Sequence, residues 1–197
     1  MKLALKLGAA FLVSVFLGLG SVYWFLEKSD FSGAGGIAVG PWTTNEQIGN
    51  VDAAPYTRAI VARRGLLALN KRETVYFNAE ADNSGTPLVS NCAYTVTGAP
   101  LPTGWWSITL YGADHYLIDN PQGIFSQAKN TIVRNDQRGY VIQVASTPEG
   151  PNGIPTGYSS GEGSRFSLTL RLYNLEEDAA EELSALVLPS IERGMCQ

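Results

Sequence analysis

The sequence predicts a mainly β protein of the two-layer sandwich class, with helices flanking the strands and one apolar helix before them. Two observations support this prediction. Apolar and polar residues alternate over 105–111 and again over 166–173, which is the period of half-buried strands. The chain of 197 residues also holds 21 Gly and 10 Pro, clustered between strand-like runs, as in loop-rich β domains.

Each alternating segment divides its side chains between two faces. In the first segment Trp106, Ile108 and Leu110 share one face, and in the second an apolar set does so: Phe166, Leu168, Leu170 and Leu172. We expect these two faces to form the inner layer of a sandwich core. The opposite faces carry rings, hydroxyls and one guanidinium.

An apolar segment opens the chain. Lys2 and Lys6 precede residues 7–26, which carry no formal charge and are long enough to cross the hydrocarbon core of a bilayer. A cleaved signal peptide is the alternative. We favour a retained anchor over 1–27, because an aromatic group that suits the interface ends the segment and no small-residue cleavage site follows: Tyr23, Trp24 and Phe25.

The flanking charges predict the orientation of this anchor. Lys2 and Lys6 lie before it, and Glu27 and Asp30 follow it. Positive residues stay on the cytoplasmic side. We therefore expect a single-pass protein of a Gram-negative inner membrane, with a cytoplasmic N-terminus and its domain in the periplasm.

Residues 28–49 are interpreted as a flexible linker, because 28–40 are small, polar and rich in Gly. Residues 50–197 then form one domain, large enough for a single core. Within it a helix is expected over 52–69, with Asp52 as a cap and Pro55 in the first turn. Further elements are expected in this order: strands over 74–81 and 91–97, a short strand at 132–133, a strand over 139–146, a long loop over 147–164, and a helix over 176–186.

The predicted helix over 52–69 carries basic residues opposite its apolar face. Arg58, Arg63 and Arg64 are candidates for contact with lipid headgroups or with an acidic partner. An ordinary solvated helix face is the alternative interpretation.

Cys92 and Cys196 are the two cysteines, and the last ten residues run extended to the second of them. An even, small number of cysteines in an exported domain predicts one disulfide, although two free thiols remain the alternative.

Several segments resemble the DUF1214 domain family, and the resemblance covers about residues 50–197. They are Thr97-Gly98-Ala99-Pro100-Leu101-Pro102, Trp105-Trp106-Ser107-Ile108-Thr109-Leu110-Tyr111, Tyr116-Leu117-Ile118-Asp119-Asn120-Pro121 and Phe166-Ser167-Leu168-Thr169-Leu170-Arg171-Leu172-Tyr173-Asn174. The helix with Tyr56-Thr57-Arg58-Ala59 is similar to the lead-in of short, membrane-anchored members.

This resemblance implies a jelly-roll-like β-sandwich, often found beside a DUF1254 domain that we do not expect here. Many members carry Asn-Trp-Leu-Pro before the final strand, where this chain reads Gly153-Ile154-Pro155-Thr156-Gly157-Tyr158. A ligand site built on that segment would be altered. The resemblance implies no activity, so no catalytic residues transfer.

The residues do not point to catalysis. His115 is the only His, so a Ser-His-Asp site must use it, and no Gly-x-Ser-x-Gly motif is present. Zinc needs closely spaced His or Cys ligands, and an acid pair for glycoside hydrolysis would have to bring Glu80 and Asp119 together. We therefore predict no catalytic residues, no metal and no cofactor. The net charge of −4 argues against nucleic acid.

The second face of the two alternating segments is the candidate ligand site. It offers rings for stacking, hydroxyls and one forked donor, which suit an anionic or glycan-like ligand. Its residues are Trp105, Thr109, Tyr111, Thr169, Arg171 and Tyr173. The alternative is that flanking helices cover this face and an acid such as Glu80 pairs with Arg171.

The function favoured by these observations is a membrane-anchored periplasmic binding or accessory module of the cell envelope. One alternative is a hydrolase of an envelope glycan or lipid that uses His115 and nearby acids. The other is an accessory subunit of a membrane protein complex.

Overall fold

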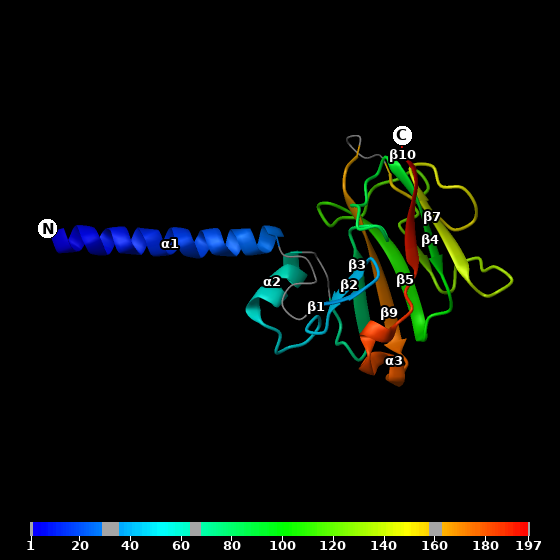
Figure 1. Ribbon diagram of the computed structural model, residues 1–197, viewed down its shortest axis with the longest axis horizontal. Helices are drawn as coiled ribbons and strands as arrows, with labels where there is room; N and C mark the ends of the chain where they lie inside the picture. The colour runs from blue at the N-terminus through cyan, green and yellow to red at the C-terminus, as the bar shows by residue number, and fades with distance from the viewer. Residues whose placement is uncertain (1, 29–35, 64–67, 158–162, 197) are drawn as a thin grey trace.

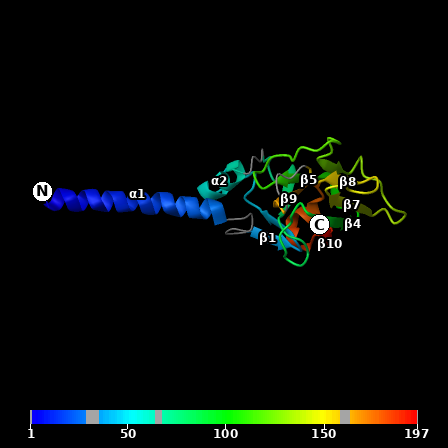
Figure 2. The same ribbon diagram turned by 90° about the horizontal axis from the view of Figure 1, so that it is seen from above.

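Two β-sheets pack face to face in the computed structural model, which describes residues 2–28, 36–63, 68–157 and 163–196 (Figure 1). A long helix, α1 (Lys2–Lys28), projects away from this sandwich. A short helix, α2 (Pro55–Arg63), lies beside the C-terminal end of α1. Viewed from above, α1 and α2 lie on one side of the six-stranded sheet and the four-stranded sheet lies on the other (Figure 2). The predicted mainly β sandwich is confirmed.

Helix α1 carries exposed side chains from Lys2 to Trp24. Its segment Lys2–Phe25 is long and apolar enough to cross a membrane. A signal sequence near the N-terminus has the same properties, so the helix fits either role.

The larger sheet has the strand order β1-β2-β3-β9-β5-β6. Its centre is the antiparallel pair β5 and β9, which runs from Thr103 opposite Leu175 to Gly112 opposite Phe166. These are the two alternating segments of the sequence, and they are neighbours. The strands are β1 (Gly36–Val39), β2 (Trp42–Asn45), β3 (Thr74–Ala79), β5 (Thr103–Gly112), β6 (Ser126–Ala128) and β9 (Phe166–Leu175).

The smaller sheet has the strand order β10-β4-β7-β8. All its pairs are antiparallel except β7 with β8, which are parallel. Its strands are β4 (Cys92–Gly98), β7 (Tyr140–Ala145), β8 (Gly153–Pro155) and β10 (Ser190–Cys196).

The core lies between the sheets, where the predicted apolar faces meet. Trp106, Ile108 and Leu170 are fully buried, as the period-2 pattern requires. The Trp106 ring stacks on Tyr140 of the other sheet with ring centroids 4.6 Å apart. Gly98 lies under that tyrosine, and a Cβ at this position would be 2.3 Å from the Tyr140 Cζ. A larger residue at this position would therefore have to displace the Tyr140 ring from the core.

Part of the predicted linker is instead ordered sheet. Residues 36–45 form the hairpin of β1 and β2, with Gly40 in the left-handed region at its turn (φ 58°). Trp42 is fully buried and its Nε1 donates to the Pro189 carbonyl over 2.7 Å. The Gly-rich composition suggested a spacer, but the burial of this one indole ties the segment to the core.

The predicted helices are shorter than expected. Helix α2 begins at Pro55 rather than at 52 and ends at Arg63, 68–69 are not helical, and the positions 64–67 lie outside the described residues. Helix α3 (Glu177–Glu181) ends because Glu182 is not helical (φ −132°, ψ 78°). The 3-10 turn η1 (Leu183–Ala185) follows and buries Leu183, so core packing outweighs helix continuation.

The predicted strand at 132–133 is wrong. The amide of Asn152 takes the place of a partner strand there, because the Val133 N–H donates to Asn152 Oδ1 over 2.8 Å and Asn152 Nδ2 donates to the Val133 carbonyl over 2.7 Å. The predicted loop over 147–164 contains the short strand β8. Strand β6, likewise short, was not predicted.

The predicted disulfide between Cys92 and Cys196 is confirmed. It joins the first residue of β4 to the last of β10, in the register Cys196 opposite Cys92 and Arg193 opposite Tyr94. The C-terminal strand is therefore attached to the sheet by a covalent bond and by its backbone hydrogen bonds.

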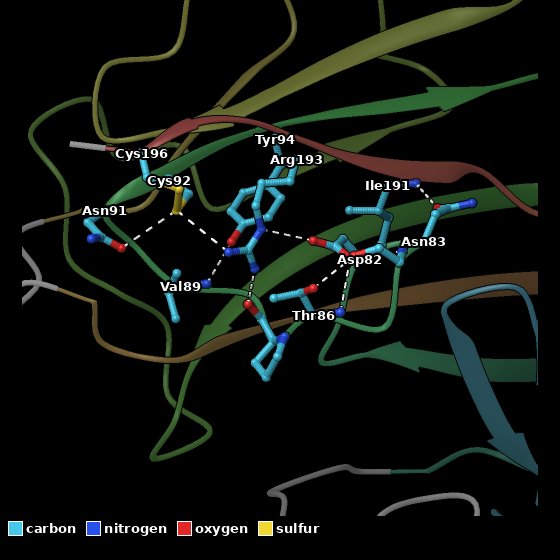
Figure 3. Close-up of polar contacts among 12 residues, drawn as sticks. Asp82, Asn83, Thr86, Val89, Asn91, Cys92, Tyr94, Ile191, Arg193 and Cys196 are labelled. Atoms are coloured by element: carbon cyan, nitrogen blue, oxygen red, sulfur yellow. Dashed lines mark hydrogen bonds and ion pairs between the residues drawn. A yellow bond between two sulfur atoms is a disulfide. The ribbon is translucent and has the colours of Figure 1, made fainter.

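A buried carboxylate supports the same corner (Figure 3). Asp82, in the turn after β3, accepts hydrogen bonds from the Ser84 N–H and Oγ (2.9 and 2.6 Å) and from the Thr86 N–H (3.1 Å). Arg193 Nε donates to its other oxygen over 2.9 Å. Burial raises the pKa of Asp82, but the hydrogen bonds from Ser84, Thr86 and Arg193 outweigh burial and hold that pKa below its ordinary value.

Candidate functional site

The outer face of the six-stranded sheet brings the predicted site residues together. Because β3, β9 and β5 are neighbours, Arg171 lies between Tyr76 and Ser107, and Thr169 lies between Asn78 and Thr109. We call the predicted set the outer-face patch: Trp105, Thr109, Tyr111, Thr169, Arg171 and Tyr173.

Arg171 is at the centre of the outer-face patch. Its Nη1 donates to Thr109 Oγ1 over 3.1 Å and its Nη2 donates to Tyr111 Oη over 2.7 Å. The guanidinium carbon lies 5.5 Å from the centroid of the Tyr111 ring. Within the described part of the chain no carboxylate lies within ion-pair distance of Arg171, so the ion pair with Glu80 that the alternative interpretation suggested is not formed.

The rim of the patch is aromatic. Trp105 is 37% exposed and packs edge-on against Tyr173, with ring centroids 5.2 Å apart. Its Nε1 donates to Asn130 Oδ1 over 3.0 Å. The Trp105 indole is therefore held by the Tyr173 ring and by the Asn130 amide. A ligand that packs on its ring face would lose little side-chain entropy from this residue.

The two threonines form a buried floor and not an exposed surface. Thr109 and Thr169 are 8% and 5% exposed. Thr169 Oγ1 donates to Asn78 Oδ1 over 3.1 Å, and Asn78 Nδ2 donates to Glu80 Oε1 over 3.2 Å. A ligand on this face would touch the rings and the guanidinium, while Thr109 holds that guanidinium in place.

The basic residues of α2 lie apart from the outer-face patch. Arg58 and Arg63 are exposed on a helix that buries no residue, and Arg64 lies outside the described residues. The helix reaches the sheet through Val61, which packs with Ile48 and Tyr76. The Phe25 ring of α1 lies 4.6 Å from the Tyr56 ring of α2.

The candidate catalytic residues make local turn contacts within the described part of the chain. His115 is half-buried in the turn after β5, and its backbone lies in the left-handed region (φ 66°). Its backbone N–H donates to the Gly112 carbonyl. The neighbouring Asp114 accepts from the Tyr116 N–H over 3.1 Å, which is a local turn contact. No group of three His, Cys, Asp or Glu converges on a metal position among the residues that the structure describes.

Two residues were missed from the sequence, one that contacts the patch and one that contacts the start of β5. Asn130 holds the Trp105 indole, and Lys129 Nζ donates to the carbonyls of Thr103 and Gly104 over 2.8 and 3.0 Å. Both follow β6, whose pairing with β5 brings them to this edge. A three-residue strand carries too weak a pattern for this contact to be predicted.

These features define the class of protein as a two-sheet β-sandwich with an apolar N-terminal helix and an arginine-centred outer sheet face. A family model described as a protein of unknown function, DUF1214, matches residues 73–177, which is more than half of the chain. The chain belongs to the DUF1214 family, as the resemblance noted in the sequence predicted.

Among solved structures, the VPA0106 protein from Vibrio parahaemolyticus is similar, with a TM-score of 0.58 at 20% identity. The match covers 90% of this chain and 43% of that one. Because the identity is low, this similarity supports the fold alone. An uncharacterized protein from Burkholderia cenocepacia matches with a TM-score of 0.40 at 16% identity, over 64% of this chain and 30% of that one. The chain spans less than half the length of either. No curated protein matches the sequence.

Proposed function

We propose that this chain is a membrane-anchored binding module of the cell envelope, with a cytoplasmic N-terminus and a periplasmic sandwich of jelly-roll type. The length of α1 and the lysines Lys2 and Lys6 before its apolar segment support a single-pass anchor with this orientation. The Cys92–Cys196 disulfide suits an oxidising compartment. The module acts by binding and not by catalysis.

The single observation that carries the binding role is the state of Arg171. A half-buried guanidinium is poorly compensated by neutral hydroxyls, yet Thr109 and Tyr111 are its hydrogen-bond acceptors. The remaining N–H groups of its planar fork can bind a carboxylate or a phosphate. The ligand is therefore an amphiphile with an anionic head, whose head binds Arg171 and whose body rests on Trp105 and Tyr173.

The placement of this face supports an amphiphilic ligand of the envelope. Helices α1 and α2 lie on the side of the six-stranded sheet that is turned away from the four-stranded sheet (Figure 2). The contact of Val61 with Tyr76 places α2 against this face. With α1 in the bilayer, the patch is turned toward the membrane from which such a ligand comes.

The test is gentle detergent extraction of the full chain from native membranes, followed by mass spectrometry of bound material. We expect wild-type protein to carry an anionic amphiphile. Arg171→Gln should reduce the bound amount by about tenfold or more, since hydrogen bonds to charged groups contribute about 1.5–3 kcal/mol. Arg171→Lys keeps the charge without the fork and should give an intermediate amount.

Arg165→Gln is the matched control, because Arg165 is exposed immediately before β9 and outside the patch. It should retain the ligand at the wild-type level. Equal loading of wild type and Arg171→Gln, with both folded by circular dichroism, would refute the site. A stoichiometric protein companion without a small molecule would instead support the role of an accessory subunit.

A further inference from the structure

The two ends of the Cys92–Cys196 disulfide differ in exposure. Cys92 begins β4 and is 4% exposed, whereas Cys196 ends the edge strand β10 and is exposed. Exchange of a disulfide with a thiol begins with attack of a thiolate on one of the two sulfurs, and its rate depends on access to that sulfur. An incoming thiolate can therefore reach Cys196 more readily than Cys92.

The sulfur of the buried Cys92 lies beside a cation (Figure 3). Arg193 Nη1 is 3.9 Å from Cys92 Sγ. The other two nitrogens of this guanidinium have acceptors of their own, since Nε donates to Asp82 over 2.9 Å and Nη2 donates to the Pro87 carbonyl. The guanidinium carbon also lies 5.4 Å from the centroid of the Tyr94 ring. These contacts fix the guanidinium with one nitrogen toward the sulfur.

Arg193 favours Cys92 as the leaving group of the exchange. A buried thiolate needs a compensating charge, and a neighbouring guanidinium supplies one. A leaving group that is stabilised as a thiolate departs faster. The Asp82 carboxylate shares this guanidinium and reduces the charge that acts on the sulfur. Exposure and charge therefore agree on one direction, in which the thiol enters at Cys196 and Cys92 leaves.

The start of β10 is held in place by contacts other than the disulfide. The Asn83 N–H donates to the Ile191 carbonyl over 2.9 Å, and the Ile191 N–H donates to Asn83 Oδ1 over 2.6 Å. Ile191 is also fully buried. The pairing of β10 with β4 shifts in register between Arg193 and Cys196, and residues 194–196 are exposed. Opening of the disulfide therefore frees the end of the strand while the core stays folded.

We propose that this disulfide exchanges with thiols in the folded protein and that Cys196 is the residue to which the incoming thiol bonds. The attacking thiolate forms a bond to Cys196 Sγ, the bond between Cys92 and Cys196 breaks, and its electron pair leaves on Cys92 Sγ beside Arg193. The Cys92 thiolate then takes a proton from water. The resulting thiol has an acceptor in Asn91 Oδ1, which is 3.8 Å away.

The partner that completes this chemistry is a dithiol. Its first thiolate forms the mixed disulfide with Cys196. Its second thiolate attacks the partner's own sulfur in that bond, so the partner becomes a disulfide and Cys196 leaves as a thiolate. Two electrons pass from the dithiol to the protein disulfide, and two protons end on Cys92 and Cys196. The site uses none of the residues of the outer-face patch, so its success or failure is independent of the proposed function.

The test treats the folded full chain, in a non-ionic detergent, with reduced glutathione. Glutathione has one thiol and therefore stops the exchange at the mixed disulfide. Acid quenching, alkylation of the denatured chain with N-ethylmaleimide and peptide mass spectrometry then show which cysteine carries each group. We expect glutathione on Cys196 and N-ethylmaleimide on Cys92, with a preference of about tenfold or more. The preference should disappear when the reaction is run in urea on the unfolded chain.

Variants at the ion pair isolate the effect of Arg193 on the rate. Asp82→Asn removes the competing carboxylate and keeps the guanidinium, so it should react with glutathione at least as fast as wild type. Asp82→Asn with Arg193→Gln leaves a neutral pair and should react about tenfold more slowly than Asp82→Asn. Asp82→Asn with Arg72→Gln is the matched control, because Arg72 is exposed in the turn before β3, and its rate should equal that of Asp82→Asn.

Dithiothreitol serves as the dithiol probe, and it should reduce the disulfide fully while the near-UV circular dichroism of the core is retained. Three results would each overturn the proposal. They are glutathione on Cys92 as often as on Cys196, equal rates in Asp82→Asn and in its combination with Arg193→Gln, and reduction of the wild type only at urea concentrations that unfold it.

Discussion

Replacement of Asp82 by Asn should destabilise the sandwich in a way that depends on pH. Asp82 is nearly inaccessible, with a side chain 2% exposed, and Arg193 opposite it is 26% exposed. The substitution keeps an acceptor for Ser84 and Thr86 but removes the charge that Arg193 needs. Breaking a fully buried ion pair costs about 3–5 kcal/mol, so we expect a loss of about 2–3 kcal/mol for this partly exposed pair.

The pH dependence follows from the lowered pKa of Asp82. Burial alone would raise that pKa, but the hydrogen bonds from Ser84, Thr86 and Arg193 lower it further than burial raises it. The folded-state pKa therefore lies below the unfolded value of about 3.9. The stability contributed by the carboxylate is complete well above pH 3.9 and is lost as the pH falls through the folded-state pKa.

The assay is thermal unfolding of the full chain in a non-ionic detergent, followed by tryptophan fluorescence, to which the fully buried Trp42 and Trp106 contribute. At pH 7 the Asn variant should have a Tm about 5–10 °C below that of wild type. This difference should shrink as the pH falls below 4. Asp136→Asn, in an exposed turn, should change the stability by less than about 0.5 kcal/mol. A Tm difference that stays constant from pH 7 to pH 2 would contradict the role of the ionised carboxylate.

Two other changes probe the core and the C-terminus. Tyr140→Phe should leave the stability unchanged or raise it by about 1 kcal/mol, because the Tyr140 hydroxyl is buried without a partner in the described structure. Urea unfolding measures this change, and a loss above about 1 kcal/mol would contradict the lack of a partner. Burial also raises the pKa of Tyr140 well above its usual range, so absorbance titration should show no ionisation of this residue before the protein unfolds. Cys196→Ser should lower the free energy of unfolding by up to about 4.7 kcal/mol in the chain-entropy model, since the disulfide spans 104 residues. In urea unfolding, reductant should lower the midpoint of wild type but not that of the variant.

The central strands were predictable because their pattern is strong and local. Strands β5 and β9 are ten residues long, apolar and polar residues alternate over 105–111 and 166–173 within them, and the alternation alone indicates which side chains enter the core. The hairpin of β1 and β2 was missed because each strand has four residues within a Gly-containing segment. Its order depends on Trp42, whose burial beside Pro189 is a contact across most of the chain.

The candidate site was predicted in its residues but not in its contacts. Period-2 spacing was enough to place Trp105, Thr109 and Arg171 on one face. It did not indicate that Thr109 and Tyr111 rather than Glu80 would be the acceptors for Arg171. That choice depends on which strand lies on each side of β9, and pairing between distant strands leaves no signal in a single sequence.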